Sequence, residues 1–205
     1  MKSFIVDASS DLFRWLSYAT IFHWIKRFAP AVKEPGSVEL WVLGNFAASV
    51  ALLALPDAPS CTWWEMAVVA YASLRTYELV VYQTNVLFFD ELRKGPGYEL
   101  RGYRRLLLLL TLNYIELIFW FALIYRHLSE SFAPSVNAYG AALAVSFSTM
   151  SGGFREAAST PVSEVAKCVV QTQSAIGFFM ALLVLARFIS LLPNPKSGDP
   201  RERNE

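Results

Sequence analysis

Four polar side chains lie inside stretches that are otherwise apolar enough to cross a bilayer. Arg75 and Glu78 fall in one such stretch, and Asn113 and Glu116 fall in the next. The members of each pair are three residues apart, so they share one face of a helix. A charge inside a membrane is costly, and it usually pairs with an opposite charge or faces the interior of a helix bundle. These residue types therefore predict a polar contact between two membrane helices.

The depth of these side chains can be counted from the outer ends of the two stretches. Arg75 and Glu116 each lie twelve residues from that end, and a helix rises about 1.5 Å per residue, so both reach a similar depth. By the same count Glu78 lies level with Asn113. We expect an ion pair between Arg75 and Glu116 that Glu78 and Asn113 support. A voltage sensor or a proton relay is the functional alternative, although a sensor needs several regularly spaced arginines and this stretch holds one.

A second set of residues suited to ion chemistry is the segment TMSGGF at 149–154. It follows an apolar run at 138–150, which is shorter than the roughly 20 residues needed to cross a bilayer. A polar linker and a long apolar run at 165–192 come next. This order, a half-length helix, a loop and a full-length helix, is typical of a re-entrant pore loop. Membranes tolerate non-helical backbone only where protein buries it or where it lines a watery cavity, so the segment predicts an ion pore.

The composition places these residues in a polytopic membrane protein. Of the 205 residues, 55% are hydrophobic and 17% are charged, whereas soluble domains carry about 25% charged residues. Two cysteines are too few for a disulfide framework. Two histidines without metal-ligand spacing exclude the usual intramembrane enzymes. We therefore expect no enzyme, no cofactor and no metal site, and the lack of a basic patch away from the membrane flanks argues against nucleic acid.

Apolar periodicity divides the chain into helices that present the pore segment. The expected fold is all-α, with four transmembrane helices, a re-entrant pore helix with its filter loop, and an N-terminal interfacial amphipathic helix at 12–28. The spans are expected at 38–55, 63–89, 106–128 and 165–192. The corresponding units are a cytoplasmic or interfacial segment at 1–36, a two-helix peripheral unit at 37–103, a pore module at 104–192 and a cytoplasmic tail at 193–205.

Lysine and arginine set the expected orientation. They gather ahead of the first span, in the loop at 90–105 and in the tail, whereas the loop at 56–62 has none. Cytoplasmic loops carry the excess of these residues. We therefore expect a multi-pass protein of the cell membrane with both termini in the cytoplasm and the re-entrant segment on the outer side.

Three stretches resemble the small bacterial two-helix potassium channel pore modules. NYIELI at 113–118 is similar to their outer helix, SFSTM at 146–150 to the end of their pore helix, and IGFFMALLVLARF at 176–188 to the end of their inner helix. The likeness covers residues 104–192. It implies a tetrameric cation channel that conducts passively, with a monovalent cation such as K⁺ as the conducted ion, and with the lipid bilayer as its surroundings.

In that family, four TVGYG loops meet so that backbone carbonyls replace the ion's hydration shell. The resemblance implies that the filter is formed by Thr149, Met150, Ser151, Gly152 and Gly153. It implies that the pore mouth is formed by Phe154, Arg155 and Glu156. Ser151 replaces the family's first glycine and Gly152 replaces its tyrosine, which removes the aromatic brace of the filter. We therefore expect a wider or more flexible pore than a strictly potassium-selective one.

Several interpretations stay open from the sequence. Gly177 can be a gating hinge, as the resemblance implies, or a site of close helix packing. Thr172 can line a cavity or form a hydrogen bond between helices. The Ser-Gly-Gly turn can be an ordinary connection between two helices. Because the filter is altered, the alternative function is a channel-derived membrane interaction protein that is nonselective or does not conduct. Lipid, membrane tension, the N-terminal helix or an unidentified partner protein remain as gating stimuli.

Overall fold

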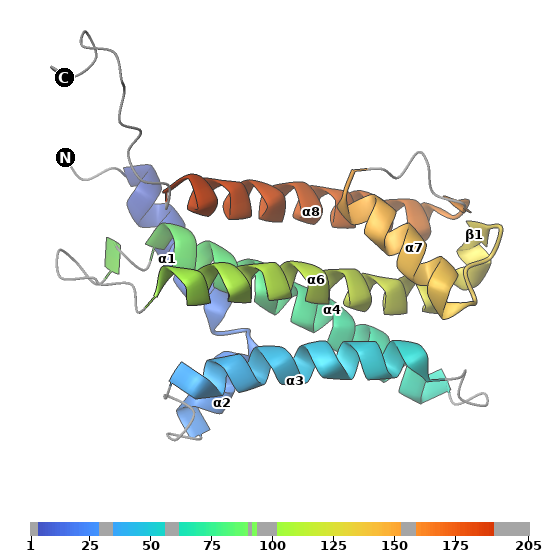
Figure 1. Cartoon of the computed structure of the whole chain (residues 1–205), viewed down its shortest axis with the longest axis horizontal. Coiled ribbons are helices and arrows are strands. Elements are labelled where there is room, and N and C mark those ends of the chain that lie inside the picture. The colour runs from blue at the N-terminus through green and yellow to red at the C-terminus, as the bar shows by residue number, and fades with distance from the viewer. Residues whose placement is uncertain are drawn as a thin grey trace, which may run out of the picture.

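The computed structural model describes residues 4–28, 35–55, 62–89, 92–93, 102–152 and 159–190. Its long helices lie side by side, with α6 (Tyr103–His127) between α3 (Pro35–Ala54) and α8 (Glu164–Ser190) in Figure 1. The fourth long helix is α4 (Thr62–Thr84), which continues into a π-helical turn, η2 (Asn85–Phe89). When α4 and η2 are taken together, the bounds of these long helices lie within three residues of the spans expected from hydropathy.

Three of these helices are long and apolar enough to cross a membrane. They cover Gly36–Ala54, Arg104–His127 and Glu164–Ala186. α4 has the length of a span, but it does not reach their hydropathy because Glu65, Arg75 and Glu78 lie along it. By length and composition, these three helices are compatible with a membrane protein.

The central helix α6 supplies more of the large buried side chains than any other described helix. It contacts α3, α4, α7 (Tyr139–Met150) and α8. Leu117, Trp120 and Tyr125 on α6 are fully buried. Its five consecutive leucines at 106–110 begin this apolar helix, and burial of such side chains is the main favourable term wherever they leave water. α6 is therefore the helix around which the others are arranged.

The connection from α6 to α8 carries the half-length helix α7. After α6 come a 3₁₀ turn, η3 (Ser129–Ser131), and a strand, β1 (Phe132–Ala133), which pairs antiparallel with β2 (Thr160–Pro161) just before α8. α8 begins with Ser163, whose hydroxyl accepts a hydrogen bond from the Ala166 N–H at 3.1 Å and so acts as the N-cap. α7 ends at Met150, and Gly152 follows its C-cap residue Ser151 with a φ of +80°, which suits the glycine that stops a helix.

The N-terminal region forms two helices rather than the single helix expected over 12–28. α1 (Phe4–Ser17) ends in a turn, and α2 (Ile21–Phe28) begins after it. The Thr20 hydroxyl donates to the Ser17 carbonyl at 2.7 Å within that turn. The Phe22 N–H, in the first turn of α2, donates to the Glu78 carboxylate at 2.6 Å. The chain forms two helices because the Glu78 side chain of α4 caps the first turn of α2, which allows a new helix to begin after the turn.

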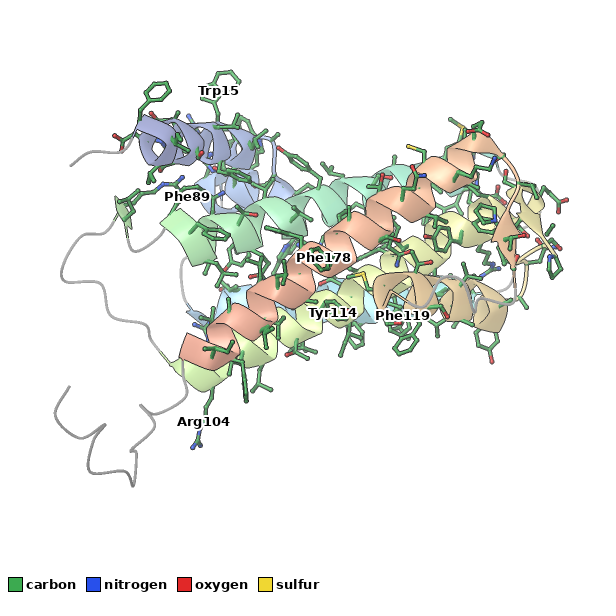
Figure 2. All side chains as sticks on the ribbon, turned by 90° about the horizontal axis from the view of Figure 1, so that it is seen from above. Trp15, Phe89, Arg104, Tyr114, Phe119 and Phe178 are labelled. Carbon is green, nitrogen blue, oxygen red and sulfur yellow. The ribbon has the colours of Figure 1, made fainter. Side chains whose placement is uncertain are left out.

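α1 lies against α4 and η2. Figure 2 shows Trp15 pointing away from the helix bundle, and its side chain is 78% exposed. On the bundle side, the Phe13 ring lies 5.7 Å from the Phe89 ring. One face of α1 thus contacts the bundle while the other presents aromatic surface outward.

Candidate functional site

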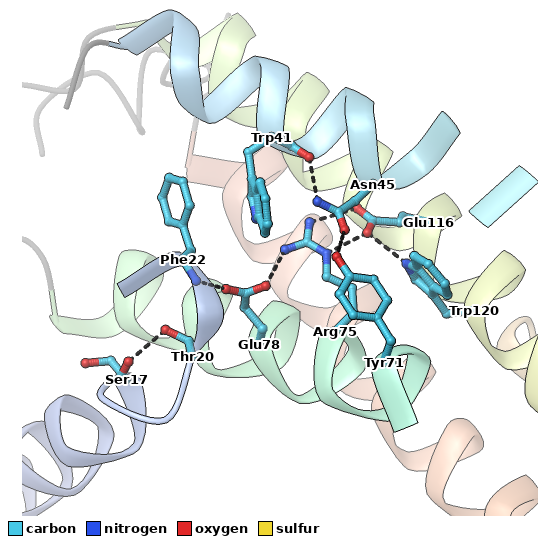
Figure 3. A network of polar contacts seen from close by, with 10 residues as sticks. All are labelled: Ser17, Thr20, Phe22, Trp41, Asn45, Tyr71, Arg75, Glu78, Glu116 and Trp120. Carbon is cyan, nitrogen blue, oxygen red and sulfur yellow. Dashed lines mark hydrogen bonds and ion pairs between the residues drawn. The ribbon is translucent and has the colours of Figure 1, made fainter. Parts of the chain in front are cut away.

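A buried ion cluster joins α4 to α6. The Arg75 Nε and Nη2 donate to the two carboxylate oxygens of Glu116 at 2.7 and 3.1 Å. The Arg75 Nη1 donates to Glu78 at 2.7 Å (Figure 3). All three residues are at most 2% exposed. The predicted contact between Arg75 and Glu116 is therefore present, and its two-pronged form is the strong geometry for a guanidinium with a carboxylate.

Aromatic side chains surround this cluster. The Trp120 indole N–H donates to Glu116 at 2.9 Å, and the Trp41 ring of α3 lies 5.7 Å from the Arg75 guanidinium carbon. A guanidinium over an indole face gains a cation–π attraction that desolvation strengthens. The cluster therefore ties α3 to the α4–α6 pair.

A neutral hydrogen-bond chain runs beside the charges. The Tyr71 hydroxyl of α4 donates to the Asn45 side-chain oxygen at 2.6 Å. The Asn45 amide in turn donates to the Trp41 carbonyl at 2.8 Å. This chain satisfies buried polar groups of α3 and α4 without adding charge.

Glu78 extends the cluster toward the N-terminal helices. One carboxylate oxygen binds Arg75 and the other accepts the Phe22 N–H. Two further contacts hold the same region, since the Tyr77 hydroxyl donates to the Leu16 carbonyl at 2.9 Å and the Asn85 amide donates to the Phe13 carbonyl at 3.1 Å. α1 and α2 are thus fixed to polar groups of α4 and η2.

Asn113 does not support the ion pair, contrary to the sequence-based expectation. It is 1% exposed, and neither its side-chain oxygen nor its nitrogen has a hydrogen-bond partner in the described part of the chain. It lines a small cavity together with Arg75 and Glu78. Asn113 and Glu78 line the same cavity, as their similar depth predicts, but no hydrogen bond joins the amide to the charged groups.

The C-terminal end of α7 lies near the midpoints of both neighbouring long helices. The Tyr114 hydroxyl, near the middle of α6, donates to the Met150 carbonyl at 3.0 Å. A Cβ on Gly177, near the middle of α8, would lie 2.7 Å from the same carbonyl oxygen. Gly177 therefore lies at a close helix contact that only glycine allows, and its role as a gating hinge stays a prediction.

Buried hydrogen bonds hold the rest of α7 in place. The Gln173 amide of α8 donates to the Ser146 carbonyl at 3.0 Å and to its hydroxyl at 2.8 Å. The Ser146 hydroxyl donates to the Ile118 carbonyl of α6 at 2.7 Å. The Tyr125 hydroxyl donates to the Gln173 side-chain oxygen. α7 is therefore joined by polar contacts to the helix before it and to the helix after it.

Of the residues predicted to form a filter, the structure describes two that are buried and two that are exposed. Thr149 and Met150 belong to the last turn of α7 and are 1% and 3% exposed. The Thr149 hydroxyl donates to the Val145 carbonyl at 2.8 Å. Ser151 and Gly152 come after the helix and are exposed. Thr149 and Met150 are thus the last two residues of a helix and are buried, whereas the alignment with the filter implied extended backbone at both.

The remaining predicted site residues are placed as follows. Thr172 on α8 is exposed, and its hydroxyl donates to the Cys168 carbonyl of the same helix at 2.9 Å. The other residues predicted to form a filter and a pore mouth, Gly153, Phe154, Arg155 and Glu156, lie outside the described residues.

Sequence reasoning gave no role at the site to Tyr114, Tyr125 or Ser146. Each is a hydroxyl-bearing residue inside an apolar run, at a depth that another polar group also reaches. Because buried hydroxyls nearly always have a hydrogen-bond partner, a second polar group at the same depth could have predicted these contacts.

Comparison with known proteins yields no match, because no family model, curated protein or solved structure is significantly similar to the chain. The function is therefore inferred from the geometry of this chain.

Proposed function

We propose that the chain is one subunit of a passive cation channel of the pore-loop type, assembled from four copies in the cell membrane. The observation that carries this proposal is the position of α7. Its C-terminal end lies beside Tyr114 and Gly177, close to the midpoints of α6 and α8. A half-length helix that ends at mid-depth between two long helices is the arrangement of a re-entrant pore helix.

The electrostatics of such a helix favour cations. The C-terminus of an α-helix carries a partial negative charge of about half an elementary charge. In a low-dielectric membrane this partial charge acts over a longer range than it would in water. One chain supplies one such helix, so an ion path that is enclosed on all sides requires several copies around an axis.

The conducting surface in this proposal is backbone rather than side chain. Ser151 and Gly152 are exposed at the end of α7, and their backbone is available to face an axis. Thr149 and Met150 act instead as the support beneath them. Residues 153–156 complete the filter and its mouth, and a monovalent cation, K⁺ among them, is the conducted ion.

The proposal includes four spans, with α4 as the fourth. Its Arg75 is neutralised by Glu116 and Glu78 at most 3.1 Å away, which reduces the cost of carrying that charge through the membrane. Both termini lie in the cytoplasm, in agreement with the lysine and arginine distribution. α1 and α2 lie at the interface, where exposed Trp15 and Phe28 meet the headgroup region.

A second candidate function is that of a non-conducting membrane interaction protein. The Met150 carbonyl already accepts a hydrogen bond from Tyr114, and the Thr149 hydroxyl already bonds within α7. Two groups that a potassium filter would offer to the ion are therefore occupied inside the chain. This observation favours a pore loop that has lost conduction.

Ion flux into liposomes separates the two candidates. The purified chain is reconstituted, and the entry of K⁺, Na⁺ and Cl⁻ is followed against protein-free liposomes. A cation channel gives K⁺ or Na⁺ entry well above the protein-free rate with no matching Cl⁻ entry. Equal entry of all three ions indicates a nonselective pore, and no flux of any ion rules out the channel.

A further inference from the structure

A small cavity lies where α2, α3, α4 and α6 meet. Its volume of about 40 Å³ exceeds the roughly 10–15 Å³ that one water needs on this measure, so it has room for about three water-sized particles. The side chains with polar atoms that line it come from the turn before α2, from α3, from α4 and from α6. They are Thr20, Trp41, Arg75, Glu78, Tyr82 and Asn113, and the buried Trp41 indole N–H has no hydrogen-bond partner among the described residues.

Asn113 is the residue that marks this cavity as a site. Its amide is buried and has no hydrogen-bond partner among the described residues, on either its oxygen or its nitrogen. A buried polar group without a partner lowers stability, and such groups are rare in folded proteins unless water or an ion satisfies them. The cavity beside the amide provides the space for that partner.

The charges beside the cavity leave a negative excess. Arg75 carries one positive charge, whereas Glu78 and Glu116 carry two negative charges, and all three are buried. Among the described lining residues Arg75 is the sole cationic side chain. The cluster therefore has a net charge of −1 in a medium of low dielectric, where an uncompensated charge is costly.

We propose that this cavity binds one small monovalent cation, of the Na⁺ or K⁺ class, between the Glu78 carboxylate and the Asn113 side-chain oxygen. One positive charge balances the excess of one negative charge, whereas a divalent ion would reverse it. Each Glu78 oxygen accepts one hydrogen bond, from Phe22 or from Arg75, and keeps a second lone pair for a ligand. Carboxylate and amide oxygens are hard donors suited to alkali cations, and water in the cavity completes the coordination.

The cation has a structural role that is separate from conduction. Glu78 also accepts the Phe22 N–H at the start of α2, so the ion stabilises the carboxylate to which the N-terminal helices are fixed. Its position between α4 and α6 places it away from the end of α7, where the proposed ion path lies. The site is therefore tested by stability, independently of flux.

The test is the thermal unfolding of the full chain in a neutral detergent at constant ionic strength. NaCl and KCl are each compared with the chloride of N-methyl-D-glucamine, a cation too large for the cavity. At about ten times the dissociation constant of the preferred ion, the unfolding midpoint is expected to rise by about 3 to 6 °C. Equal midpoints in all three salts overturn the proposal and leave water alone, or a proton on Glu78, in the cavity.

Matched variants locate the effect. Asn113→Leu removes the amide and fills the cavity, and it is expected to abolish the salt-dependent rise. Asn45→Leu is the control, because Asn45 is also a buried asparagine but does not line the cavity, so this variant keeps the rise whatever its baseline stability. A rise that persists in Asn113→Leu overturns the assignment. If that variant does not fold, Glu78→Gln removes the excess charge and is expected to lose the rise as well.

Discussion

The backbone carbonyl of Met150 occupies the space that any side chain on Gly177 would need. An added Cβ would lie 2.7 Å from that oxygen and 3.1 Å from the Met150 sulfur. The end of α7 and the middle of α8 are therefore in contact at a point where only glycine fits. This contact fixes how far α7 extends into the space between α6 and α8.

Gly177→Ala is expected to destabilise the protein by about 1–3 kcal/mol, because overpacking a closely packed contact forces backbone to move. It is also expected to lower cation flux, since α7 has to withdraw from α8. The measurements are detergent unfolding and liposome flux. Gly140→Ala, in α7 with nothing within 4 Å of the added Cβ, is the matched control. Equal behaviour of the two variants would contradict the role of this contact.

Glu116→Ala is expected to cost about 1–3 kcal/mol of folding free energy or more, because it leaves the buried Arg75 Nε and Nη2 and the Trp120 indole N–H without the carboxylate that accepts their hydrogen bonds. Chemical unfolding in detergent measures the loss. Glu164→Ala is the control, since Glu164 pairs with Lys167 at 2.8 Å on an exposed surface and such pairs contribute little. If Glu116→Ala is as stable as the unchanged protein and assembles normally, the ion cluster does not stabilise the fold.

Gln173→Leu is expected to cost about 1–3 kcal/mol, because it leaves the Tyr125 hydroxyl and the Ser146 carbonyl without their buried partner. The same substitution at exposed Gln171, two residues earlier on α8, is expected to be close to neutral. A double-mutant cycle with Tyr125→Phe then measures the coupling between Tyr125 and Gln173. A coupling of zero would mean that the two side chains do not act together.

The proposed orientation predicts which loops are accessible from outside the cell. With the native cysteines changed to serine, Ser135→Cys, in the exposed loop before α7, is expected to react with a membrane-impermeant maleimide in intact cells. Leu92→Cys, on the opposite side in the proposal, is expected to react only after the membrane is opened. The reverse labelling pattern would invert the topology and place α7 on the cytoplasmic side.

The helices and one long-range contact could be predicted from the sequence because both follow from the regular geometry of an α-helix. The length of an apolar run sets the length of a membrane helix, and a constant rise per residue sets the depth of each charge. Arg75 and Glu116 could therefore be paired from their positions in the sequence alone. Depth alone does not decide whether two side chains touch, and Asn113 consequently lines a cavity beside the ion cluster without a hydrogen bond to it.

The break between α1 and α2 was harder to predict for a related reason. It depends on Glu78, which lies 56 residues further along the chain than Phe22. Contacts between distant segments decide such a break, and local pattern carries no trace of them. The extent of α7, by contrast, agrees with the apolar run at 138–150 in the sequence.

The short ribbon of β1 and β2 has a consequence for how this chain can vary. Ala133 pairs with Thr160, and the Val162 N–H donates to the Ser131 carbonyl at 2.8 Å, so both ends of the α7 segment are fastened together. The spacing of α6 and α8 at that end is therefore independent of how many residues lie between the strands. The number and type of residues between the two strands can therefore change while the strands keep α6 and α8 at the same spacing.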